Sequence, residues 1–135
     1  MNEEAQAWFR KAQRRLETAQ VTRNLVSPGC VVDSAYFAMF QAATAMGVAD
    51  GKRYPKCSLW LDAFGQAFVD TGRVQPQFFD DLREAYRLRQ IAAYGIREED
   101  RIAPQVADSV ISKAEIFVTM AEEFLRGSGG KSENP

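Results

Sequence analysis

The chain contains no histidine among its 135 residues. This absence removes the usual general base near neutral pH, and with it every Ser-His and Cys-His nucleophile pair. It also removes the commonest protein ligand of zinc and iron. A site made only of carboxylates could still bind a metal, but the acidic residues fall mostly on predicted outer faces, as Glu122 and Glu123 do. We therefore expect neither a metal nor a cofactor.

Cysteine is scarce, and long hydrophobic runs are missing. The two cysteines, Cys30 and Cys57, show neither close pairing nor the spacing of a metal site. No apolar run approaches the ~20 residues that a membrane-spanning helix needs. The first residues, MNEEAQAWFRK, are charged from the start and do not resemble a signal peptide. These features predict a cytoplasmic protein with reduced thiols and no membrane partner.

Neither sign of charge dominates the chain. The formal net charge is -1 and charged residues make up 26%, so nucleic-acid binding would need a local basic patch. With 46% hydrophobic residues, the chain can fill one core. We expect one helical domain over residues 1–126 and a disordered tail, GSGGKSENP, over residues 127–135.

Helical periodicity runs through the chain, whereas strand alternation and hairpin turns are missing. This pattern predicts an all-α, up-and-down bundle of four to five helices. The second helix, within VVDSAYFAMFQAATAM, is apolar nearly all round, which is typical of a central helix. We expect a second copy of the chain to help cover it. The other helices are expected before Ser27, from about Ser58 to Gly72, from Pro76 to about Tyr94 with Gly95 as terminator, and from about Pro104.

One arginine of the fourth helix stands where a charge is not expected. In REAYRLRQIAAYG, residues 83–95, Arg89 projects into the middle of an apolar stripe at about 100° per residue. A structural arginine would pair with a carboxylate such as Asp33 or Asp62, because buried charges are rarely unpaired. Alternatively, a guanidinium in a cleft between helices could hold a phosphate bidentately. Periodicity leaves both interpretations open.

Four segments carry a family resemblance. They are AWFRKAQRRLETAQ, DSAYFAMFQAATAM, YPKCSLWLDAFGQAFVDTGRV and LREAYRLRQIAAYG. Together they resemble the small stand-alone bacterial and archaeal HEPN domains (higher eukaryotes and prokaryotes nucleotide-binding), whose second helix reads AYYAMFHAA. The resemblance implies a helical bundle that dimerises.

The resemblance also implies a function. Many HEPN proteins are metal-independent RNases of toxin-antitoxin or phage-defence systems, with an arginine followed a few residues later by histidine at a dimer cleft. Some act beside a small nucleotidyltransferase that adds AMP to a nearby tyrosine, and others bind nucleotide or RNA without catalysis. Arg89 matches the family arginine, Gln90 the polar position after it, and Tyr94 the tyrosine of the stand-alone subgroup.

The chain departs from the family pattern at three positions. Ala93 replaces the usual aspartate, and Gln41 and Ser58 stand where relatives often have histidine. Tyrosine, with an ordinary pKa of about 10, is a poor base near neutrality. RNase activity is therefore expected to be slow or absent unless another group substitutes.

The expected function is a HEPN-type dimer that binds nucleotide or RNA phosphate, beside a small nucleotidyltransferase. A divergent RNase toxin that uses Arg89 and Tyr94 stays open, and so does a purely structural dimer. The candidate residues for anion binding are Arg89, Gln90, Arg83, Arg87 and Lys56, with Asp33 and Tyr36 as candidates from the second helix.

Overall fold

The computed structural model describes residues 3–53 and 59–133, with side chains described as far as residue 127. The α-helices are α1 (Glu3–Thr22), α2 (Pro28–Ala49), α3 (Leu59–Phe64), α4 (Pro76–Tyr94) and α5 (Pro104–Glu133). A short π-helical turn, η1 (Gly65–Val69), continues α3, and a 3-10 turn, η2 (Glu98–Asp100), lies between α4 and α5. No strand occurs in these two ranges. The predicted all-α class is confirmed.

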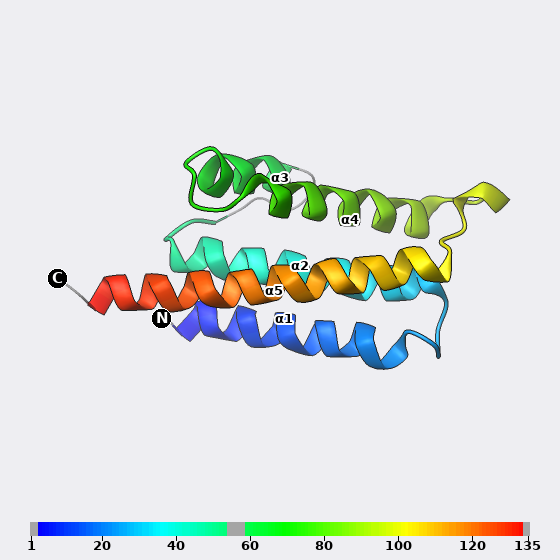
Figure 1. Ribbon diagram of the computed structural model, residues 1–135, viewed down its shortest axis with the longest axis horizontal. Helices are drawn as coiled ribbons and strands as arrows, with labels where there is room; N and C mark the ends of the chain where they lie inside the picture. The colour runs from blue at the N-terminus through cyan, green and yellow to red at the C-terminus, as the bar shows by residue number, and fades with distance from the viewer. Residues whose placement is uncertain (1–2, 54–58, 134–135) are drawn as a thin grey trace.

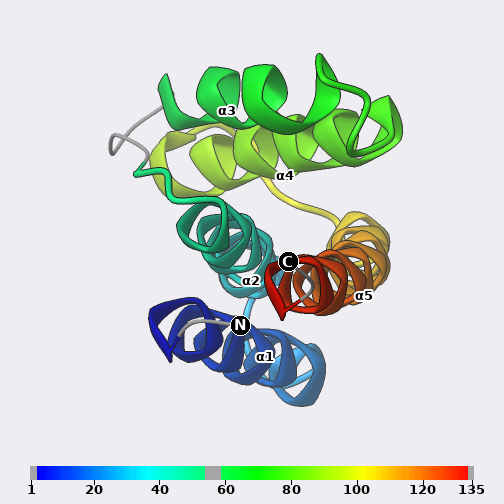
Figure 2. The ribbon, with the colours of Figure 1, turned by 90° about the vertical axis from the view of Figure 1, so that its left-hand side faces the viewer.

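The four long helices lie along the long axis of the molecule and alternate in direction (Figure 1). α2 packs against α1, α4 and α5. The end-on view shows α2 between α1 and α4, with α5 beside it and α3 on the outer side of α4 (Figure 2). This is the up-and-down bundle that the periodicity predicted.

The central position of α2 explains its composition. Thirteen of its 22 residues are buried, and most of these are alanine, valine or methionine. α1, α4 and α5 pack against α2 and cover most of it, so the apolar character of α2 does not by itself require a second copy. Dimerisation itself stays a prediction that needs other support.

Local signals place the ends of the helices. Ser27 precedes α2, and its side-chain oxygen accepts a hydrogen bond from the backbone N–H of Cys30. Pro28 and Pro76 occupy the first turns of α2 and α4, where proline is favoured. α5 begins at Pro104 as predicted and continues to Glu133, beyond the boundary suggested at residue 126.

Two glycines end helical segments for different reasons. Gly72, where the third segment was expected to end, has a φ of 76°, which favours glycine. Gly95 ends α4 as predicted, but its φ of -71° suits any residue. A Cβ atom at position 95 would lie 2.5 Å from the Cβ of Asp100 and 2.6 Å from the backbone oxygen of Ile91. Glycine there lets the connection to α5 approach the end of α4 closely.

Aromatic side chains form much of the core. Phe64 is fully buried, with its ring centroid 5.1 Å from that of Phe68 and 5.9 Å from that of Phe117. Phe68 is fully buried as well, so both Phe64 and Phe68 point into the core. Within the described ranges, no helix is both long and apolar enough to cross a membrane.

Candidate functional site

A cavity of about 560 Å³ opens between α1, α2, α3, α4 and the segment that follows α2. Its volume lies within the range of small-molecule sites. Half of the described residues that line it are aromatic, and we call it the aromatic cavity. Its lining residues are Glu4, Trp8, Tyr36, Phe37, Phe40, Thr44, Val48, Lys52, Arg53, Trp60, Tyr86, Arg89, Gln90 and Tyr94.

Arg89 reaches the aromatic cavity from α4 and is held by a carboxylate of α2. Its Nε donates a hydrogen bond to Oδ1 of Asp33 at 3.1 Å, and its Nη1 donates to Oε1 of Gln90 at 3.1 Å. The side chains of Arg89 and Asp33 are 26% and 42% exposed. Of the two suggested partners, Asp33 is the one that binds Arg89. Nη2 makes no hydrogen bond to the side chains and backbone that the structure describes, so part of the donor capacity of the guanidinium is unused.

The ring of Phe37, on α2, contacts two guanidinium groups. The Cζ atom of Arg89 lies 5.2 Å from the ring centroid, and so does the Cζ atom of Arg15, on α1. Cations at this distance are attracted by an aromatic ring. Phe37 therefore brings a second arginine to the edge of the aromatic cavity, although the sequence did not suggest Arg15 as a site residue.

Tyr36 forms a buried part of the cavity wall. It is 4% exposed, and its ring centroid lies 5.8 Å from that of Tyr86 and 6.2 Å from that of Phe40. Burial raises the pKa of the Tyr36 hydroxyl above its ordinary value, against the opposing effect of a hydrogen bond from Trp60. The hydroxyl therefore stays neutral at physiological pH and is suited to hydrogen bonding rather than to action as a base.

The motif residues of α4 lie together. Tyr86, Gln90 and Tyr94 follow one another at steps of four, and Arg89 lies beside this row. Tyr94 is 72% exposed, whereas Gln90 is partly buried and accepts the hydrogen bond from Arg89. Arg89, Gln90, Tyr94 and Tyr36 thus line one cavity. Asp33 does not line it but forms an ion pair with Arg89.

Two predicted cations do not line the aromatic cavity. Arg87 donates two hydrogen bonds to Glu84, at 2.6 and 3.1 Å, and this interaction lowers the pKa of the Glu84 carboxyl. The guanidinium of Arg83 lies 5.5 Å from the ring centroid of Phe79. Both arginines are exposed on other faces of α4, because their positions project well away from that of the motif arginine.

Three further sequence-based positions are not among the described residues that line the cavity. Lys56, a predicted anion-binding residue, and Ser58, the predicted helix cap, lie outside the described residues. Gln41, where HEPN proteins often have histidine, is buried in α2 and is not among the lining residues. Its Oε1 makes no hydrogen bond to the described part of the chain.

The described residues that line the aromatic cavity include three cations and one carboxylate. Besides Arg89, they are Lys52 and Arg53, from the segment after α2, and Glu4, from α1. Arg53 pairs with Glu4 at 2.7 Å, and the Nζ of Lys52 lies 3.0 Å from a carboxylate oxygen of Asp50. Exposed pairs of this kind contribute only ~0–1 kcal/mol, so an incoming anion can displace them at small cost. The arrangement favours an anion that carries an aromatic group, because the walls offer stacking surfaces.

Lys52, Arg53 and Trp8 line the cavity, although the sequence did not suggest them as site residues. The spacing along the chain could have indicated Lys52. Starting from Tyr36, every fourth residue lines the cavity, and Lys52 is the last of this row. Nothing in the sequence placed Trp8 at this cavity, because its position depends on how α1 packs against α2.

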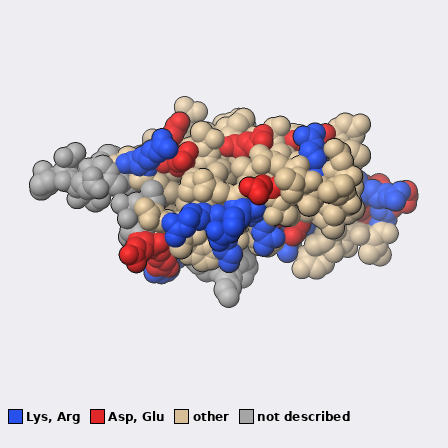
Figure 3. Space-filling view, turned by 90° about the horizontal axis from the view of Figure 1, so that it is seen from below, with Lys and Arg blue, Asp and Glu red and all other residues tan. Residues whose placement is uncertain are grey.

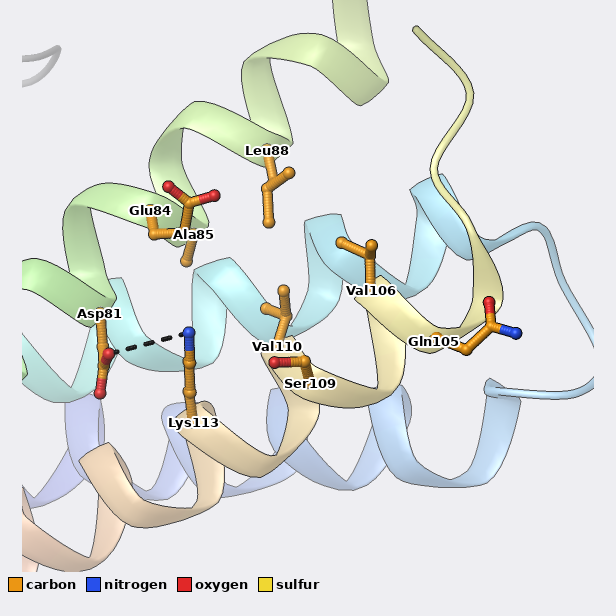
Figure 4. A pocket seen from close by; sticks show the side chains of 9 residues that line it. All are labelled: Asp81, Glu84, Ala85, Leu88, Gln105, Val106, Ser109, Val110 and Lys113. Carbon is orange, nitrogen blue, oxygen red and sulfur yellow. Dashed lines mark ion pairs between the residues drawn. The ribbon is translucent and has the colours of Figure 1, made fainter. Parts of the chain in front are cut away.

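A second cavity, of about 240 Å³, lies between α4 and α5 (Figure 4). Asp81 and Lys113 face each other there, with 4.0 Å between Oδ1 and Nζ, and Gln77 donates a hydrogen bond to Asp81 at 2.8 Å. Glu84, on the same wall, is bound by Arg87. The charged groups of this cavity already have partners, and none of the predicted site residues lines it. The aromatic cavity is therefore the stronger candidate site.

Comparison with known proteins gives a consistent match along the chain. A family model described as HEPN domain matches residues 5–124. The protein named Putative toxin MJ0142, of Methanocaldococcus jannaschii, is 26% identical over 122 residues, covering 90% of this chain and 82% of that protein. Putative toxin MJ0605 of the same organism is 27% identical over 126 residues, covering 93% and 92%. UPF0332 protein glr0978 of Gloeobacter violaceus is 28% identical over 125 residues, covering 93% and 98%.

Proposed function

Because this chain belongs to the HEPN domain family, we propose that it binds a nucleotide, or a phosphate of RNA, in the aromatic cavity. Arg89 holds the phosphate, and the aromatic walls stack the base. The position of Arg89 carries this proposal. Its side chain is half-buried and is paired with Asp33. Among the described residues, its Nη2 has no hydrogen-bond partner, and half of those that line the cavity are aromatic.

The wider role that we propose is the HEPN component of a toxin-antitoxin or defence pair. Two of the relatives carry the word toxin in their names. The proposed partner is a small nucleotidyltransferase, and Tyr94 is its proposed target for the addition of AMP, because the side chain is 72% exposed beside the cavity. A nucleotidyltransferase gene next to the gene of this protein supports the pairing, and an isolated gene speaks against it.

A divergent metal-independent RNase is the second candidate, since Arg89 and Tyr94 line the same cavity. Attack by a 2′-OH needs a proton acceptor, a proton donor and a stabilised phosphate. Arg89 supplies the last of these. However, the chain has no histidine, and the one carboxylate among the described lining residues, Glu4, is bound to Arg53. Binding is therefore the main proposed function, with slow or absent cleavage.

Arg89→Ala separates binding from cleavage. Calorimetric titration with AMP is expected to show affinity reduced ~10- to 100-fold in this variant, because a hydrogen bond to a charged group contributes ~1.5–3 kcal/mol. Mixed RNA incubated with the wild-type protein in EDTA is expected to stay intact. Arg83→Ala is the matched control, since Arg83 lies on the same helix but outside the cavity.

The other outcomes distinguish the candidates. RNA cleavage that disappears in Arg89→Ala identifies the RNase. Unchanged AMP affinity in Arg89→Ala, together with reduced thermal stability, identifies a structural arginine and contradicts both functional candidates.

A further inference from the structure

α1 carries four cations close together, and no carboxylate of the described residues forms an ion pair with any of them. Arg10, Lys11, Arg14 and Arg15, which we call the basic band, occupy neighbouring positions on the helix surface. None has a carboxylate oxygen of the described residues within 4.0 Å, whereas every other arginine of the described side chains except Arg83 is in an ion pair. Basic side chains gather near the middle of the face that α1 forms (Figure 3).

The basic band reaches the aromatic cavity through two of its members. Arg15 lies over Phe37, the same ring that Arg89 contacts, and Phe37 lines the cavity. The Nζ of Lys11 lies 5.3 Å from the ring centroid of Trp8, another wall residue. The rest of the band extends the positive charge away from the cavity across the exposed side of α1.

The charge of the band is local rather than a consequence of composition. The formal net charge of the chain is -1, yet four positive side chains share about one and a half turns of α1. Arg10 and Arg14, like Lys11 and Arg15, are four positions apart, and like charges at this spacing destabilise a helix. A polyanion bound along the band relieves this repulsion.

We propose that the basic band binds the phosphate backbone of a single-stranded nucleic acid, one base of which occupies the aromatic cavity. This inference rests on the proposed function of the cavity and extends its ligand from a mononucleotide to a strand. The strand is single because bases paired in a duplex are not free to stack on protein aromatics. Positive charge along the backbone and aromatic surfaces under the bases form the combination that binds single strands.

Two triple variants test the band. Arg10→Gln/Lys11→Gln/Arg14→Gln removes three of its charges without altering any residue that lines the cavity, and glutamine keeps good helix propensity. The matched control, Arg23→Gln/Arg97→Gln/Arg101→Gln, removes three charges from beyond the end of α1 and from the connection between α4 and α5. Each protein is titrated with AMP, with a single-stranded RNA of roughly ten nucleotides and with a duplex of the same sequence. This length is close to the site size of single-strand-binding domains. Anisotropy is measured over a range of salt concentrations.

The band variant is expected to bind the single strand at least ~10-fold more weakly than the wild type. The slope of log affinity against log salt concentration is expected to be smaller in magnitude by about two, since each lost phosphate contact reduces it by ~0.7. Its affinity for AMP is expected to be unchanged, and the control variant is expected to match the wild type. If both variants lose affinity for the strand equally, the inference is overturned, because net charge and not the basic band then determines binding. If the band variant binds the strand as tightly as the wild type, the inference is overturned, and an acidic protein becomes the expected ligand of the band. Equally tight binding of the duplex overturns the single-strand assignment.

Failure of the proposed function gives a different pattern. If the wild-type protein binds the strand but not AMP, and the band variant still weakens strand binding, the proposed role of the cavity fails while the role of the band stands.

Discussion

The position of Arg89 is compatible with both roles that the sequence presented as alternatives. Arg89 pairs with Asp33, and it also lines the aromatic cavity, where Nη2 makes no hydrogen bond to the described residues. The ion pair fixes the guanidinium, which is a requirement for a binding residue as much as for a structural one. Arg89 was identifiable from sequence because a charge in an apolar stripe breaks the helical pattern. Its partner was not, because Asp33 and Asp62 both fitted the pattern.

Asp33→Asn tests the balance between these roles. Asparagine keeps the shape and an acceptor oxygen for the Nε of Arg89, but it removes a negative charge beside the proposed phosphate. We expect the affinity for AMP, measured by calorimetry, to rise about three- to tenfold, because one charge at a partly exposed position contributes ~1 kcal/mol. Asp108→Asn removes a charge that pairs with Arg23 elsewhere, and it serves as the control. A fall in AMP affinity in Asp33→Asn would show instead that the carboxylate is needed mainly to position Arg89.

The ends of the helices were predictable because they depend on local signals. Pro76 and Pro104 begin α4 and α5, and Gly95 follows the last residue of α4. The walls of the aromatic cavity were only partly predictable, because α1 and the segment after α2 add Trp8 and Arg53 through contacts between distant parts of the chain. Helical periodicity records which face of an element is apolar, but not which neighbour that face meets.

Gly95→Ala tests the close approach at the end of α4. The added Cβ would overlap Asp100 and the backbone oxygen of Ile91, so the connection must move. We expect the free energy of unfolding, measured by urea denaturation, to fall by ~1–3 kcal/mol, which is typical of overpacking. Gly127→Ala is the matched control, because its Cβ meets nothing within 4 Å and alanine favours the helix. Equal stability of the two variants would contradict the importance of this approach.

Dimerisation belongs to the scale of the whole molecule. The prediction of a dimer rests on the likeness to HEPN proteins rather than on the apolar α2, against which α1, α4 and α5 pack. We predict that light scattering at micromolar concentration gives about twice the chain mass of 15.1 kDa. A stable monomer at that concentration would restrict the binding site to the residues of one chain.

Binding of a nucleotide phosphate by Arg89 is tested most directly by NMR. The Nε–H resonance of Arg89 is identified by its absence from the spectrum of Arg89→Lys. We predict that AMP shifts this resonance with a saturating dependence on concentration, while the Nε–H resonance of Arg83 stays in place. AMP binding that leaves the Arg89 resonance unmoved would place the nucleotide elsewhere and contradict the proposed role of the aromatic cavity.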